Sequence, residues 1–159
     1  MENIIIIIIE DQREVLEAIA KDLAFFEDAF LIEECDSADE AEELMESLDA
    51  EGHHIALVVS DHIMPGRSGV DFLIELNADD RFRATKKVLL TGLATHSDTI
   101  NAINNAAIDR YLEKPWDANQ LISYSKSLIT EFILKKGIRY ESYMKYLDNE
   151  IIRNKLHHG

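Results

Sequence analysis

Short apolar runs alternate along this chain with longer amphipathic segments. The apolar runs have the length of strands and lack polar alternation, which is typical of strands buried on both faces; they cover residues 4–9, 30–33, 55–60, 87–91 and 108–112. Segments with apolar residues at helical spacing follow each run; they cover residues 14–26, 37–48, 68–77, 97–106 and 117 to at least 134. This order predicts an α/β fold, a doubly wound (βα)5 parallel five-stranded sheet with helices on both faces.

The last part of the chain is less regular. A second helical stripe of apolar residues runs from Tyr140 to Ile152, beyond Gly137. Either the preceding helix continues through Gly137, or a separate short helix follows. A glycine inside a helix costs about 1 kcal/mol of helix stability relative to alanine. We expect residues 1–134 to form one domain and residues 135–159 a helical tail or linker. A monomer should not leave such a stripe exposed, so the tail is expected to form a homodimer or join an output domain.

The charge narrows the choice of partners. The net charge is −15, and residues 1–116 carry 9 basic and 26 acidic side chains. Such an acidic body argues against direct nucleic-acid binding and agrees with binding of a metal or a basic protein patch. The one cysteine, Cys35, excludes an intramolecular disulfide and suits a reducing cytoplasm. We expect neither a signal peptide nor a membrane span, because the run at residues 4–9 is too short.

Acidic residues stand directly after the first and third predicted strands, as Glu10-Asp11 and Asp61. The carboxyl ends of parallel strands share one edge of a sheet, where ligands bind, so these carboxylates should lie together. They would repel each other unless neutralised, and Mg²⁺ prefers such oxygen ligands. A carboxylate can also be the nucleophile in phosphoryl transfer, with cations neutralising the phosphoryl oxygens. Thr91, at the end of the fourth predicted strand, is a candidate hydroxyl donor, and Lys114, after the fifth, is a candidate second cation.

Four motifs in order connect the chain to a known family. They are Glu10-Asp11, Asp61-x-x-Met64-Pro65-x-x-x-Gly69, Thr91-Gly92 and Lys114-Pro115. Over residues 3–130 the chain resembles a bacterial response-regulator receiver domain, the chemotaxis-receiver-like phosphoacceptor module of two-component signal transduction. The resemblance implies the flavodoxin-like strand order 2-1-3-4-5.

The resemblance also implies the chemistry. Asp61 would accept a phosphoryl group from a phosphohistidine of a sensor histidine kinase or phosphotransfer protein. Asp11, Asp61 and the backbone carbonyl of Ile63 would hold Mg²⁺, with Glu10 acting mostly through water; Mn²⁺ can take the same place. Lys114 would pair with Asp61 and then with the phosphate.

Further positions follow from the same resemblance. The Thr91 hydroxyl and the N–H groups of Ile63 and Gly92 would hold phosphoryl oxygens, and the peptide before Pro115 would be cis. Tyr111 would rotate into the space that Thr91 vacates and so switch the surface around the fourth helix, fifth strand and fifth helix. A half-buried strand aromatic without that role is the alternative for Tyr111.

Other functions stay in view. The resemblance implies no enzyme in the usual sense, only catalysis of the chain's own phosphorylation and dephosphorylation. A haloacid-dehalogenase-type phosphohydrolase would need a second acid at position 63, where this chain has isoleucine. A phosphorylation-independent pseudo-receiver is disfavoured by Asp61, Thr91 and Lys114. We expect the side chains of Ile63 and Leu93 to tune the lifetime of the phosphoryl group.

Overall fold

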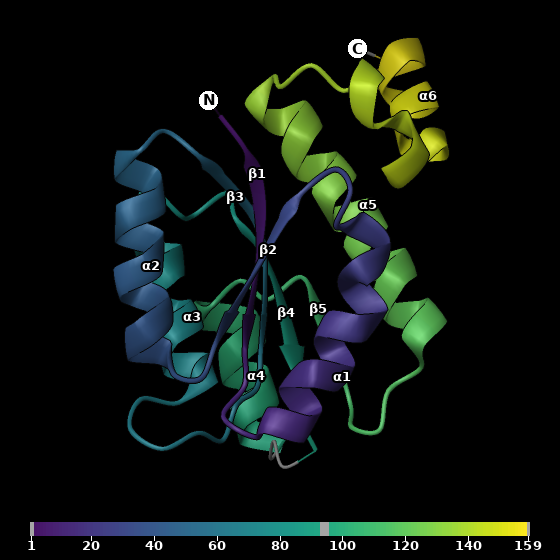
Figure 1. Ribbon diagram of the computed structural model, residues 1–159. Helices are drawn as coiled ribbons and strands as arrows, with labels where there is room; N and C mark the ends of the chain where they lie inside the picture. Colours follow the sequence, from purple (N-terminus) through teal and green to yellow (C-terminus); the bar gives the residue numbers. More distant parts are fainter. Residues whose placement is uncertain (1, 93–95, 159) are drawn as a thin grey trace.

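A five-stranded parallel sheet forms the centre of the protein (Figure 1). The structure is a computed structural model that describes residues 2–92 and 96–158. The strands lie in the order β2-β1-β3-β4-β5, which confirms the predicted fold class and strand order. Their bounds are β1 Ile4–Ile9, β2 Leu31–Cys35, β3 His54–Ser60, β4 Lys86–Leu90 and β5 Arg110–Leu112.

Helices cover both faces of the sheet, α1 and α5 on one and α2, α3 and α4 on the other (Figure 1). Their bounds are α1 Arg13–Leu23, α2 Ala38–Ala50, α3 Gly69–Ala78, α4 His96–Asn105, α5 Ala118–Lys136 and α6 Asn149–His158. All six isoleucines of β1 are buried. Ile4, Ile6 and Ile8 pack toward α1 and α5, whereas the other three pack toward α2–α4. Burial on both faces explains why this strand has no polar alternation.

Polar side chains define the starts of three helices. Ser37 accepts a hydrogen bond from the N–H of Glu40 before α2, and Ser68 accepts one in the same way before α3. The Asp117 carboxylate accepts the N–H of Asn119 at the start of α5. Each satisfies a backbone donor that the first helical turn leaves unpaired. The predicted elements are therefore confirmed, with bounds that shift by up to three residues.

The differences at α1 and β5 have identifiable causes. The predicted helix 14–26 is split, since α1 ends at Leu23 and a 3₁₀ turn, η1 Ala24–Phe26, follows. The predicted strand 108–112 is shorter, because Ala107 has a positive φ of 52°. Asp109 then uses its carboxylate to accept the backbone N–H of Lys87, at 2.7 Å. The ladder with β4 consequently begins at Arg110.

Gly137 ends α5 and decides between the two alternatives for the tail. It adopts a left-handed conformation with φ 71°, and its N–H returns to carbonyls of the last turn. This is a common helix ending that glycine adopts without steric penalty. A second 3₁₀ turn, η2 Glu141–Tyr146, and the separate helix α6 follow.

The tail packs against its own domain beside η1 and α5. Leu147 and Ile152 are buried in the core that α1 and α5 share. The rings of Tyr143 and Phe30 lie 5.4 Å apart, and those of Tyr146 and Phe25 lie 5.7 Å apart. Much of the Tyr140–Ile152 stripe is thus covered within the chain, and the premise that a monomer leaves it exposed is wrong. The division at residue 134 stays a prediction.

The apolar segments of the chain pack on the two faces of the sheet. Among the described residues, no helix combines the length and the apolar character needed to cross a bilayer.

Candidate functional site

The carboxyl ends of the strands meet around a cleft of about 550 Å³. Most of the predicted site residues line this cleft, namely Asp11, Asp61, Ile63, Thr91, Gly92 and Lys114. Three residues that were not predicted as ligands also line it, namely Gln12, Met64 and Pro65. Gln12 was missed, although its place directly after Glu10-Asp11 is a usable signal. Glu10 and Tyr111 do not line the cleft.

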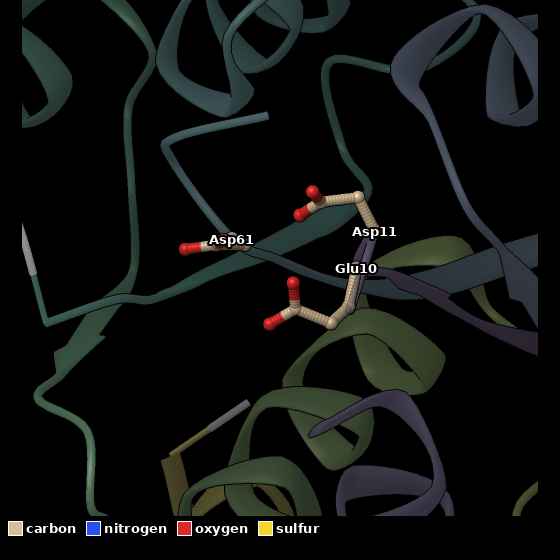
Figure 2. A group of neighbouring side chains, drawn as sticks. All are labelled: Glu10, Asp11 and Asp61. Carbon is tan, nitrogen blue, oxygen red and sulfur yellow. The ribbon is translucent and has the colours of Figure 1, made fainter. Parts of the chain in front are cut away.

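Three carboxylates gather at the ends of β1 and β3 (Figure 2). One oxygen each from Glu10, Asp11 and Asp61 lies within 4.8 Å of the others. Glu10 is fully buried and Asp61 nearly so, whereas Asp11 is exposed to the cleft. An exclusively oxygen donor set of this size suits a hard divalent cation that keeps part of its water shell. The residues present therefore fit Mg²⁺.

Lys114 supplies the positive charge next to these acids. Its Nζ lies 2.5 Å from Oε1 of Glu10 and 3.4 Å from Oδ2 of Asp61. The closer partner is Glu10, whereas the resemblance had implied Asp61. Burial raises the pKa of the Glu10 carboxyl, and the hydrogen bond from Lys114 opposes this rise without cancelling it. Glu10 thus lies beneath the cleft as a buried anchor for Lys114.

Hydrogen bonds fix Asp61 at the end of β3. Its N–H donates to the carbonyl of Ile9 at 3.0 Å, which continues the ladder with β1. Its Oδ1 accepts the N–H of His62 at 2.8 Å, and its carbonyl accepts the Ser60 hydroxyl at 2.8 Å. The first and third of these bonds fix the backbone of Asp61, and the second orients its carboxylate.

Gly69 has a steric role at the same place. A Cβ built on this residue would lie 1.7 Å from the carbonyl oxygen of Asp61. No side chain can occupy that space, so the glycine of the Asp61-to-Gly69 motif is required by the close approach of α3 to the end of β3.

Thr91 and Gly92 extend from β4 on the other side of the cleft. The N–H of Thr91 donates to the carbonyl of Leu112 at 3.1 Å, and the N–H of Lys114 donates to the carbonyl of Thr91 at 3.4 Å. The Lys114–Pro115 peptide is cis, as predicted. Leu93 lies outside the described residues.

Tyr111 lies on β5 and is partly buried against the α2–α4 side of the core. Burial raises the pKa of its phenol. This placement agrees both with a switch aromatic and with the simpler packing alternative.

The fold and the site define a class of protein. The sequence profile of the response regulator receiver domain matches residues 6–126, so the chain belongs to this family. It is a receiver domain of the type that two-component signalling uses, and phosphoacceptance is the general role of the family.

Individual relatives agree. The chain is 31% identical over 131 residues to the response regulator Rre1 of Synechocystis sp., covering 80% of this chain and 52% of the relative. It is 27% identical over 117 residues to the hydrogenase transcriptional regulatory protein HoxA of Cupriavidus necator, covering 74% of this chain and 22% of the relative. The chain therefore spans about half the length of Rre1 or less than a quarter of HoxA.

Solved structures share the fold. A CheY-like receiver domain protein from Methanospirillum hungatei superposes with a TM-score of 0.70 at 22% identity, covering 84% of this chain and 99% of the other. The signal receiver domain of an HD domain-containing protein from Pseudomonas fluorescens gives a TM-score of 0.75 at 23% identity, covering 86% and 94%.

Proposed function

We propose that Asp61 is the phosphoacceptor of this receiver domain and takes its phosphoryl group from a phosphohistidine on a partner kinase or phosphotransfer protein. The observation that carries the proposal is the group of three carboxylate oxygens within 4.8 Å of one another beside the Lys114 ammonium. In the transfer, a bond forms between an Asp61 oxygen and phosphorus, and the bond from phosphorus to the histidine nitrogen breaks.

Glu10, Asp11, Asp61 and the backbone carbonyl of Ile63 would hold Mg²⁺ or Mn²⁺, with Glu10 mostly through water. When bound, the ion neutralises charge on the phosphoryl oxygens during in-line transfer. The buried, lysine-paired Glu10 supports an indirect role for that residue.

The chain's own residues orient the transfer. The His62 N–H holds one Asp61 oxygen, while the other faces Lys114. Lys114 lies near enough to move from Glu10 toward a phosphoryl oxygen when charge arrives on Asp61. The Thr91 hydroxyl and the N–H groups of Ile63 and Gly92 would hold the remaining oxygens, since all three residues line the cleft.

The signal would leave the site through Thr91 and Tyr111. Movement of Thr91 toward the phosphate would open space for the Tyr111 ring and bias the surface of α4, β5 and α5 between two states. The partners are a sensor histidine kinase and, since the chain spans only part of Rre1 and HoxA, an output domain or second copy. Catalysis is limited to the chain's own phosphorylation and dephosphorylation, in the reducing cytoplasm that a single buried thiol suits.

Exposure to acetyl phosphate with Mg²⁺, followed by intact mass measurement, tests the proposal. The wild type should gain the mass of one phosphoryl group, and Asp61→Asn should gain none. Asp71→Asn, which removes an exposed acid of the nearby α3, is the matched control and should be modified like the wild type. A wild type without added phosphate, or an Asp61→Asn variant that still acquires it, would overturn the assignment.

A further inference from the structure

The loop between β3 and α3 carries the candidate site but has little backbone support. It begins at Asp61 and ends where Ser68 starts α3. No backbone hydrogen bond holds residues 63–67, all of which the structure describes. Two side chains anchor this stretch instead. Met64 is buried among the apolar residues of the α2–α4 side, and Arg67 reaches three carboxylates.

Arg67 connects the loop to two helices. Its Nη2 lies 2.6 Å from Oδ1 of Asp39 and 3.1 Å from Oε2 of Glu42, both on α2, and its Nη1 pairs with Glu75 on α3. The guanidinium also lies 5.1 Å from the ring centre of Phe72. Arginine suits this place because its planar fork can serve several carboxylates and stack on a ring together.

We propose that Arg67 is a positioning residue for the reaction at Asp61: by fixing the loop to α2 and α3, it presents the backbone carbonyl and N–H of Ile63 to the metal and the phosphoryl group. The proposal rests on the function proposed for Asp61. Ile63 does not anchor its own backbone by packing into the core, because the residue is 48% exposed. With Arg67 absent, only Met64 would anchor the loop between its ends.

Arg81 provides a matched control within the same chain. It pairs with Glu46 on α2 at 2.6 and 2.8 Å and with Asp79 at the end of α3 at 2.8 Å. It too stacks on a ring, that of Phe82, at 4.8 Å. Arg81 therefore repeats the chemistry of Arg67 between α2 and the residues after α3, but at the end of these helices away from the cleft. Its loss removes the same charge and similar ion pairs without touching the β3–α3 loop.

The experiment compares Arg67→Met, Arg67→Lys and Arg81→Met with the wild type. Calorimetric titration gives the Mg²⁺ affinity, and the initial rate with acetyl phosphate gives reactivity at saturating Mg²⁺. Arg67→Met should weaken Mg²⁺ binding by about 10-fold, the lower end of the range for residues that orient metal ligands. Arg67→Lys should recover part of the loss, because lysine keeps the charge without the fork. Arg81→Met should bind Mg²⁺ like the wild type.

The dependence on salt shows whether Arg67 anchors the loop through its ion pairs or through packing. Added KCl screens exposed ion pairs, so the ratio of Mg²⁺ affinities between wild type and Arg67→Met should shrink as KCl rises. If Arg67→Met does not fold, Glu75→Ala replaces it under the same criterion.

Wild-type Mg²⁺ affinity in Arg67→Met, or equal losses in Arg67→Met and Arg81→Met, would overturn the positioning role. These outcomes differ from failure of the proposed function, which would appear as a wild type that neither binds Mg²⁺ nor accepts phosphate.

Discussion

At the residue scale, Gly69 leaves no room for a side chain. Alanine there would place its Cβ 1.7 Å from the Asp61 carbonyl oxygen, so either α3 or the end of β3 must shift. We expect Gly69→Ala to lower the free energy of unfolding by about 1–3 kcal/mol, as overpacking does, and to slow phosphorylation of Asp61. Urea denaturation and the acetyl phosphate rate measure the two effects.

Gly52→Ala is the control for this prediction. Gly52 has a φ of 86° and nothing within 4 Å of a built Cβ, so alanine costs about 1–2 kcal/mol through backbone strain alone. Its phosphorylation rate should equal that of the wild type. Normal reactivity in Gly69→Ala would show that the close approach is unimportant for the site.

The burial of Lys87 leads us to expect that the free energy of unfolding depends on pH. It is buried in the sheet, with its Nζ donating to the carbonyls of Thr85 and Arg83. Burial lowers the pKa of its ammonium from 10.5 to about 8. Between these values the unfolded chain binds more protons than the folded one, so this group's contribution to stability increases as pH rises.

The stability of the wild type relative to Lys87→Met should therefore increase from pH 7 to pH 10, by at most about 3 kcal/mol for such a shift. Denaturant melts of both proteins across this range provide the measurement. Taking the difference in free energy of unfolding between the two proteins cancels the titrations that they share, including those of Tyr111 and Cys35. A constant difference would mean that Lys87 titrates normally.

The sequence was sufficient for some residues and not for others. Asp61, Thr91 and Lys114 could be placed together, because each follows a strand and parallel strands end at one edge. The closer pairing of Lys114 with Glu10 could not be predicted, since it depends on how deeply the Glu10 side chain is buried. The ion pairs of Arg67 and Arg81 could not be predicted either, because helix packing alone brings their carboxylate partners near.

At the element scale, Asp148 joins the tail to α5. Its Oδ2 accepts the Ser127 hydroxyl at 2.9 Å, and its N–H donates to Oγ1 of Thr130 at 2.8 Å. Its Oδ1 accepts the N–H groups of Glu150 and Ile151 at the start of α6. One side chain thus begins α6 and fixes it to the domain.

Asp148→Ala should lower the free energy of unfolding by about 1–2 kcal/mol, from the lost helix cap and the lost hydrogen bond to Ser127. Hydrogen exchange should show faster opening of residues 141–158 than of the sheet. Glu150→Ala removes the same charge from an exposed position and should have the smaller effect. Equal losses in the two variants would contradict the docking role of Asp148.

Periodicity predicted each element but not the placement of the last ones. The stripe beyond Gly137 was recognised as apolar, yet nothing local indicates that its tyrosines meet Phe25 and Phe30. Such contacts between distant segments depend on where α5 ends. The left-handed Gly137 sets that point, and a glycine can equally lie inside a helix.

At the scale of the whole molecule, metal binding should be visible as stability. An ion that binds only the folded state raises the free energy of unfolding by an amount set by its concentration relative to Kd. The increase is about 2.7 kcal/mol at 100 times Kd. Mg²⁺ should raise the Tm of the wild type, and EDTA should reverse the rise. Asp11→Asn, which removes one of the three clustered carboxylates, should show little response. An equal rise in both proteins would indicate general screening of the net charge of −15.

The most direct test of the whole account locates the phosphoryl group chemically. Protein treated with acetyl phosphate and Mg²⁺ is reduced with borohydride, which converts an aspartyl phosphate to homoserine, and is then digested and sequenced by mass spectrometry. Homoserine is expected at position 61 and at no other acid, with none formed when Mg²⁺ is withheld. Homoserine at position 11 in place of position 61, or unmodified peptides throughout, would contradict phosphorylation at Asp61.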